Sequence, residues 1–405
     1  MENIIHVSCS GKILIIGGYL ILEKENFGLV LTTNSRFHTF ISSTENPNLI
    51  SIFSQNYDQN YSYEFSTNPI FLKSTNPKIF PSNKFLETTL LFTLSFIYSS
   101  KNLSPLEKKG LKMTIFGDSA FYSKKSNDSM GKTGLGSSAA LVVSLTGSLL
   151  HFFQIVDLAN PKSEDLFLIH NLSQFCHCVA QGKIGSGFDI SAAVYGSQKF
   201  QRFSQTVLKE YIEKPFEIEP HFLESFSKLI NSKEKWDNFI QPFKLPSNTK
   251  LILIDTLSGG SETVPMVRRY LKWKNEKPQE SSKIISHLKK NNSKMENLLN
   301  QKEILEEQID QIRKIGTKIR FLMKKMGELS DVPIEPEEQS QRINQIFSIK
   351  EVIFAGIPGA GGLDAIFVIY IDKEDIFKEI EEKIRILKMR IIDLKIINKP
   401  IQLEK

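Results

Sequence analysis

The sequence predicts an α+β fold with two lobes. Segments with β pattern come early in the chain and an apolar helix follows a glycine-rich loop, an order that differs from a regular alternation of strands and helices. The chain has 405 residues, 40% of them hydrophobic, which is enough to bury two adjoining cores. Residues 203–247 are less patterned, so we expect lobes at residues 1–215 and 216–405 with a cleft between them.

Apolar patterns place the elements of the first lobe. Longer apolar segments without Pro predict buried helices at residues 84–98, 139–153 and 163–181. Short β patterns predict strands at residues 4–7, 12–16, 29–42, 49–53 and 111–116, with a turn at residues 8–11 and a continuation of the β pattern at residues 19–23. On the third of these strands we expect Arg36 and His38 to face outward.

The second lobe is predicted to mix strands with charged helices. Strands are expected at residues 250–255, 351–355 and 365–371, and a helix runs toward Arg268 and Arg269. Residues 281–328 are rich in Lys and Glu, with apolar residues at spacings of three, four and seven. Because few clean heptads persist there, two packed helices of a globular lobe are favoured over a coiled coil.

Composition limits the partners and the compartment. The net charge is +6, and Lys is scattered among Glu, which favours an anionic small-molecule site over a nucleic-acid partner. Three cysteines cannot form a disulfide framework, and Cys176-His177-Cys178 in an apolar helix is more typical of packing than of a metal site. With no signal peptide, membrane span or carboxyl-terminal address in the sequence, we expect a cytoplasmic location and no membrane partner.

One glycine-rich stretch organises the functional prediction. Its residues are Lys132, Thr133, Gly134, Leu135, Gly136, Ser137, Ser138, Ala139 and Ala140. The glycines lie where a polar loop becomes an apolar helix, and there unpaired backbone N–H groups and the helix dipole favour an anion. The two serines suit a helix cap, and their hydroxyls are also able to reach a phosphate or its magnesium ion.

The stretch differs from the common nucleotide motifs. It lacks the Gly-Lys-Ser/Thr ending of a Walker loop. A Rossmann turn is excluded because no strand runs directly into the loop and no acidic residue follows at the expected distance. Taken alone, the stretch is equally consistent with a flexible turn capped by serine.

Two further glycine motifs could face a ligand. In residues 181–191, glycines surround Lys183, Ser186 and Asp189 and allow a tight turn that presents a hydroxyl and a carboxylate. Asp189 could equally cap a helix at residues 190–195. The glycine-rich connection at residues 356–365 is longer than a hairpin needs, so it is either a ligand-facing loop or a flexible hairpin.

Together these stretches resemble the GHMP kinases, the group of galactokinase and of homoserine, mevalonate and phosphomevalonate kinases. Ser10-Gly11-Lys12 resembles the first motif of the group, residues 132–140 its phosphate-binding motif and residues 357–363 its carboxyl-terminal glycine motif. Within the group the chain is most similar to the fungal-type phosphomevalonate kinases, on residues 11–20, 132–139, 180–189, 260–264 and 357–365. Gly17-Gly18-Tyr19 stands where many members have Gly-Glu-His, which argues against mevalonate kinase and galactokinase.

The resemblance implies a two-lobe fold, with a ribosomal-S5-like amino-terminal lobe and a ferredoxin-like carboxyl-terminal lobe. It implies transfer of phosphate from ATP to 5-phosphomevalonate, giving ADP and 5-diphosphomevalonate in the mevalonate pathway of isoprenoid and sterol-precursor synthesis, with ATP and Mg²⁺ bound. Lys12 and Asp189 are the implied catalytic residues, and residues 132–140 the ATP loop with Ser138 as metal ligand. The implied substrate contacts are Lys12, Tyr19, Lys183, Ser186, Gly187, Ser261 and Gly361.

The implied chemistry agrees with these residue types. Donor and acceptor phosphates bring several negative charges together, so catalysis consists mainly of alignment and charge neutralisation, which lysines and backbone N–H groups supply. Mevalonate kinase and diphosphomevalonate decarboxylase, which share the scaffold, are the alternative enzymes. A GHMP-fold protein that binds ATP or sugar as a regulator without catalysis is the alternative of another class, and the presence of both Lys12 and Asp189 disfavours it.

Overall fold

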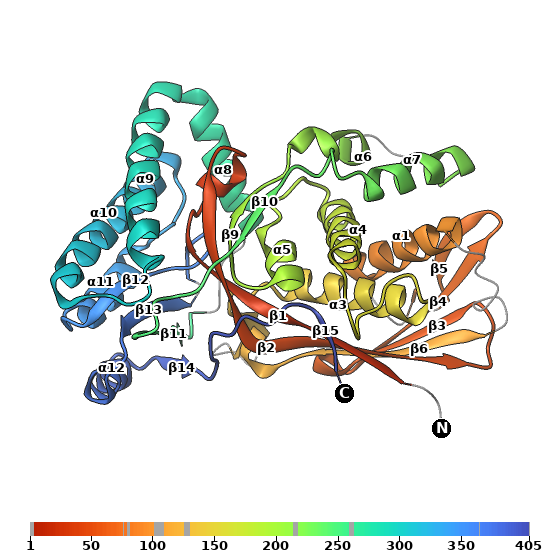
Figure 1. Cartoon of the computed structure of the whole chain (residues 1–405), viewed down its shortest axis with the longest axis horizontal. Helices are drawn as coiled ribbons and strands as arrows, with labels where there is room; N and C mark the ends of the chain where they lie inside the picture. Colours follow the sequence, from red (N-terminus) through yellow and green to blue (C-terminus); the bar gives the residue numbers. More distant parts are fainter. Residues whose placement is uncertain are drawn as a thin grey trace.

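The computed structural model of the chain describes residues 4–75, 77–78, 82–100, 109–124, 130–213, 218–258, 263–363 and 365–404. Figure 1 shows a large sheet with helices stacked above it on one side of the molecule, and a smaller sheet with long helices on the other. Strands β1 and β2 run from the first part toward the second (Figure 1). The chain is therefore an α+β protein whose largest hydrophobic core includes buried residues of both sheets, with a further core on the smaller sheet.

Strand β2 (Phe27–Thr44) is the centre of the larger, nine-stranded sheet. It pairs antiparallel with β1 (Ile5–Ile16) along one side, and with β6 (Gly110–Gly117) and β9 (Gln198–Gln201) along the other. β3 (Leu49–Ser54) pairs parallel with β6. The outer strands are β4 (Gln59–Thr67), β5 (Ile70–Ser74), β10 (Phe239–Pro242) and β15 (Gln402–Leu403).

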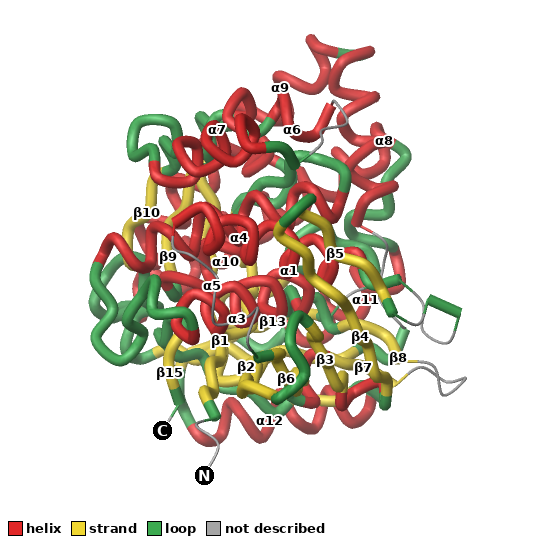
Figure 2. The backbone as a smooth tube through the Cα atoms, turned by 90° about the vertical axis from the view of Figure 1, so that its right-hand side faces the viewer, coloured by secondary structure: helices red, strands yellow, loops and turns green. Residues whose placement is uncertain are grey.

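Helices cover one face of this sheet (Figure 2). α3 (Ser137–Phe152) lies against β1 and β2, and its Ser144 hydroxyl is 2.8 Å from the Thr39 hydroxyl of β2. α3 is buried on every side from Ala139 to Leu150, as its small apolar sequence predicts. Around it pack α1 (Lys84–Ser100), α4 (Ser163–Gln181) and α5 (Phe188–Tyr195), with α6 (Lys209–Glu213) and α7 (Pro220–Asn231) outside them.

The opposite face of the sheet is partly covered by the carboxyl-terminal segment. Arg36 points to this face, as predicted, but it is buried rather than exposed. Its guanidinium donates to the Ser8 and Ser10 hydroxyls and to the Pro400 carbonyl, and it lies 3.4 Å from the Glu404 carboxylate. A buried guanidinium needs such a set of acceptors, and the returning chain supplies several of them.

The smaller sheet has the ferredoxin-like order. β11 (Thr249–Asp255), β12 (Val352–Gly356), β13 (Ile366–Ile371) and β14 (Arg390–Ile392) lie in the order β12-β13-β11-β14 and pair antiparallel. In chain order this is a βαββαβ arrangement with extra helices in the first crossover. Its helices are α8 (Thr263–Glu276), α9 (Pro278–Leu299), α10 (Glu306–Ser330), α11 (Glu337–Phe347) and α12 (Glu374–Ile386). α9 and α10 pack against each other, which confirms two globular helices in place of a coiled coil.

Several local predictions were wrong. Residues 8–11 are not a turn, because β1 is one strand with a register shift between Ser10 and Lys12. The β pattern at residues 19–23 is a short 3-10 helix. In the polar stretch before the glycine-rich loop, β7 (Tyr122–Lys124) pairs antiparallel with β8 (Met130–Lys132). The 3-10 helices are η1 (Leu20–Leu22), η2 (Gln55–Tyr57), η3 (Ser119–Phe121) and η4 (Gln205–Val207).

The predicted division at residue 215 stays a prediction, although β10 adds residues 239–242 to the larger sheet. Within the described ranges, none of the helices combines the length with the apolar character that crossing a membrane requires.

Candidate active site

Strand β1 and the loop at residues 133–136 are hydrogen-bonded to each other. The backbone N–H of Lys12 donates to the Leu135 carbonyl at 2.9 Å. The Lys12 ammonium donates to the Gly134 carbonyl at 2.7 Å and lies 5.1 Å from the centre of the Phe188 ring, within cation–π range. Lys12 is buried, contrary to the usual exposure of a strand lysine. Its charge is therefore held where the loop meets helices α3 and α5.

The start of α3 has the geometry of an anion site. Gly136 is the N-cap, with a φ of 82°, and Ser137 and Ser138 are the first helical residues. The predicted serine cap was wrong, because no side chain caps the helix. Gly134 also has a positive φ, 79°, so the two glycines give the loop its left-handed turns. The first amides of a helix have no intrahelical partner, and here they lie beside the Lys12 ammonium.

The other residues of the predicted ATP loop contribute mainly backbone and packing. Thr133 is buried and its hydroxyl donates to the Ala120 carbonyl at 2.5 Å. Leu135, Ala139 and Ala140 lie in the core. Lys132 is exposed at the end of β8. The loop is thus held by the packing of Thr133 and Leu135. The groups left for a ligand are Lys132, the two serines and backbone amides.

The second glycine stretch connects α4 to α5 beside this loop. Gly182 ends α4 with a φ of 63°, and Gly187 is the N-cap of α5 with a φ of 85°. Asp189 is therefore inside the first turn of α5 and is not its cap, although its carboxylate accepts the Ile190 N–H at 3.0 Å. Ser186 is half-buried in the connection.

Charged groups from both lobes meet around Lys183. Burial lowers the pKa of Lys183; the nearby Asp189 carboxylate opposes that shift and the Arg268 guanidinium adds to it. Arg268 comes from α8 of the second lobe, and among the described residues it has no carboxylate partner, whereas Arg269 pairs with Asp331 at 3.3 Å. Arg268 was not among the predicted site residues; its only signal in the sequence was the helix predicted to run toward Arg268 and Arg269.

His177 also lies at this site and was not predicted to. Its Nε2 is 3.2 Å from the Ser138 hydroxyl. Burial lowers its pKa, with Asp189 opposing the shift. Cys176 and Cys178 on either side are fully buried, as a packing role requires. Among the described residues, no three His, Cys, Asp or Glu side chains converge as a metal site.

The third glycine motif joins the two lobes. The Tyr19 hydroxyl donates to the Ala360 carbonyl at 2.8 Å, and the Tyr19 ring lies 4.8 Å from Tyr270 of α8. A Cβ on Gly361 would lie 2.1 Å from the Ile334 carbonyl oxygen, so only glycine fits there. The motif is an anchored loop, and the roles of Tyr19 and Gly361 as substrate contacts stay predictions. Ser261 lies outside the described residues.

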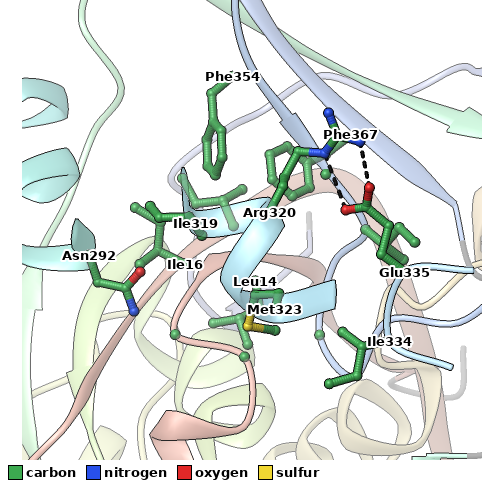
Figure 3. A pocket seen from close by; sticks show the side chains of 16 residues that line it. Leu14, Ile16, Asn292, Ile319, Arg320, Met323, Ile334, Glu335, Phe354 and Phe367 are labelled. Carbon is green, nitrogen blue, oxygen red and sulfur yellow. Dashed lines mark hydrogen bonds and ion pairs between the residues drawn. The ribbon is translucent and has the colours of Figure 1, made fainter. Parts of the chain in front are cut away.

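A small cavity lies behind this junction, lined by Gly17, Gly18, Asn292 and Gly359 among others. Figure 3 shows Arg320 and Glu335 joined by hydrogen bonds at its edge. Its volume is about 50 Å³, whereas ligand pockets measure roughly 300 to 1,000 Å³. The cavity therefore has room for a few water molecules but not for a nucleotide.

Comparison with known proteins identifies the family. The family model described as the GHMP kinases N terminal domain matches residues 107–197, which contain the 133–136 loop and Asp189. The peroxisomal phosphomevalonate kinase of Arabidopsis thaliana is 32% identical, over 89% of this chain and 89% of that protein. The phosphomevalonate kinase of Gibberella zeae is also 32% identical, over 93% of this chain and 90% of that protein. The chain belongs to the phosphomevalonate kinase family.

A solved structure shares the fold of this chain. The phosphomevalonate kinase of Streptococcus pneumoniae, in complex with phosphomevalonate and AMPPNP, has a TM-score of 0.71 at 16% identity, covering 97% of this chain and 99% of that chain. The similarity confirms the predicted GHMP kinase fold for a phosphomevalonate kinase family member. The A. thaliana relative is named peroxisomal, so the predicted cytoplasmic location stays a prediction.

We expect Gly136→Val to weaken nucleotide binding by about 10-fold or more. Its Cβ would lie 3.0 Å from the Lys12 side chain, and its φ of 82° strains any residue except glycine. Equilibrium titration with AMPPNP measures the effect. Gly182→Ala is the matched control, because Gly182 also has a positive φ but nothing lies within 4 Å of its Cβ position. Equal loss in both variants would show that backbone strain alone is responsible.

Proposed function

We propose that this protein is a phosphomevalonate kinase that transfers the γ-phosphoryl group of ATP to 5-phosphomevalonate, giving ADP and 5-diphosphomevalonate in the mevalonate pathway. The observation that carries the proposal is the burial of the Lys12 ammonium at the loop that begins α3, in a chain of this family. A phosphate oxygen of the acceptor bonds to the γ-phosphorus. The bond from that phosphorus to the β–γ bridging oxygen breaks, and ADP leaves with the electron pair.

ATP is assigned to residues 132–140, with its phosphates against Gly134, Gly136 and the first amides of α3. Mg²⁺ keeps several waters and needs only one or two protein oxygen ligands besides phosphates, so the absence of a three-ligand cluster among the described residues is compatible with it. Ser138 and Asp189 supply oxygens on this side of the site. When bound, the ion neutralises charge on the phosphates.

The acceptor is assigned to the cluster around Lys183, Ser186 and Gly187, with Arg268 facing it from the second lobe. A phosphate acceptor has a second pKa of about 6 and is largely ionised at neutral pH, so it needs no base. It must instead approach another polyanion. Lys12 stabilises charge on the transferring group, while Asp189 orients the cations beside it.

A substrate panel tests the function. ADP release is measured with 5-phosphomevalonate, mevalonate and 5-diphosphomevalonate in turn. We expect turnover with 5-phosphomevalonate only. Turnover of mevalonate alone would indicate mevalonate kinase, carbon dioxide release from the diphosphate would indicate the decarboxylase, and tight ATP binding without any transfer would indicate a regulator.

Lys12→Met is expected to slow single-turnover transfer by about 100-fold or more, the typical loss when a preorganised charge-stabilising donor is removed. Asp189→Asn should slow it less, because a phosphate acceptor gives up no proton. Rapid-quench measurements with saturating substrates separate this step from binding. A larger loss for Asp189→Asn would restore a base role and favour an alcohol acceptor.

Arg268→Gln is expected to raise KM for 5-phosphomevalonate by about 10- to 100-fold, because charge-assisted hydrogen bonds contribute about 1.5 to 3 kcal/mol. KM for ATP should change little. Arg269→Gln is the control, because Arg269 is the next residue of α8 and carries the same charge but pairs with Asp331 on the surface. A similar rise in both variants would mean that the field of the helix surface, and not a contact of Arg268, attracts the acceptor.

A further inference from the structure

The histidine of the Cys176-His177-Cys178 run contacts the nucleotide loop. His177 lies on α4 and only 3% of it is exposed. Its Nε2 is 3.2 Å from the Ser138 hydroxyl of α3 and 3.2 Å from the side-chain nitrogen of Gln181, one turn further along α4. The ring also packs against Phe85 of α1, with 5.4 Å between ring centres. Three helices therefore fix the imidazole beneath Ser138.

The partners of Nε2 set the direction of these hydrogen bonds. A side-chain amide nitrogen only donates, so Nε2 accepts from Gln181. A ring nitrogen that accepts carries no proton, so the Ser138 hydroxyl also donates to it. Both contacts of Nε2 therefore belong to a ring nitrogen that carries no proton and accepts.

The Ser138 hydroxyl carries one proton, and its oxygen has two lone pairs. With the proton directed to His177, the lone pairs remain for another partner, and a hydroxyl oxygen is a ligand that hard divalent cations accept.

We propose that His177 is a positioning residue for the divalent cation of the nucleotide: it holds the Ser138 hydroxyl in the orientation in which the oxygen faces the cation. This inference rests on the proposed placement of MgATP at Ser138. His177 itself touches neither the cation nor the phosphates. Its removal should therefore act on metal-bound nucleotide and leave metal-free nucleotide and the acceptor nearly unaffected.

The test is equilibrium binding of AMPPNP with Mg²⁺ and with EDTA, together with binding of 5-phosphomevalonate. His177→Leu removes the acceptor at similar volume and should weaken Mg²⁺–AMPPNP by about 10-fold, the equivalent of a hydrogen bond of about 1.4 kcal/mol. Metal-free AMPPNP should weaken less than about 2-fold on the same scale. His177→Gln, whose amide oxygen reaches a similar point, should recover most of the loss.

His170→Leu is the matched control. His170 is buried on the same helix two turns earlier, but its Nδ1 bonds to Asn171 at 2.9 Å. This substitution should cost stability and leave the ratio of metal-bound to metal-free affinity unchanged. If His177→Leu does not fold, His177→Asn, whose amide stops short of Ser138, takes its place.

A double-mutant cycle with Ser138→Ala distinguishes the positioning role of His177 from the placement of the nucleotide at Ser138. If His177 acts through Ser138, adding His177→Leu to Ser138→Ala should produce no further loss. A further 10-fold loss in the double variant, or an equal loss for metal-bound and metal-free nucleotide, would overturn the positioning role. If Ser138→Ala alone binds Mg²⁺–AMPPNP normally, the placement of the nucleotide fails, and the inference fails with it.

Discussion

The site depends first on the contact between strand β1 and the 133–136 loop. Two hydrogen bonds from Lys12, one from its backbone and one from its ammonium, connect the strand to the loop. The contact is possible because side chains are absent on both sides. A Cβ on Gly11 would lie 3.3 Å from the Cβ of Leu135, and one on Gly136 would lie 3.0 Å from the stem of Lys12. Lysine normally loses substantial rotamer entropy when it is fixed, and here the cost is met by packing of its stem and by the Gly134 carbonyl.

Several cationic side chains among the described residues lie near this contact. Three of them are Lys12, Lys183 and Arg268. The Asp189 carboxylate is also near Lys183, where it opposes the lowering of the lysine pKa. Like charges held together in a partly buried site disfavour the unliganded state. A polyanionic ligand removes that repulsion, so the cluster favours a pair of phosphorylated substrates over an uncharged alcohol. Because Arg268 belongs to α8 of the second lobe, both lobes contribute charged groups near Lys183.

The sequence predicted most helices and the position of the loop because those features are local. The apolar run of α3 and the amphipathic pattern of α4 determine burial without reference to distant partners. Arg36 and His177 show what a local pattern cannot contain. Arg36 is buried by residues 400–404, and His177 gains its role from Ser138 of a neighbouring helix. Residues 8–11, predicted as a turn, contain a bulge within β1. The segments on either side form one strand because both pair with β2, a distant contact that the local pattern does not show.

A second set of contacts joins the two lobes. Arg320 of α10 pairs with Glu335, the Ile334 carbonyl beside it accepts the Gly362 N–H at 2.9 Å, and the glycine loop contacts Gly18 and Tyr19. A Cβ on Gly18 would lie 2.7 Å from the Gly359 carbonyl oxygen and would push the loop away from β1. Lys12 lies on β1, shortly before Gly18 in the chain. Arg268 lies on α8, whose Tyr270 packs on Tyr19. The glycines at the junction therefore let the 356–363 loop lie against residues 17–19, beside the place where α8 packs on Tyr19.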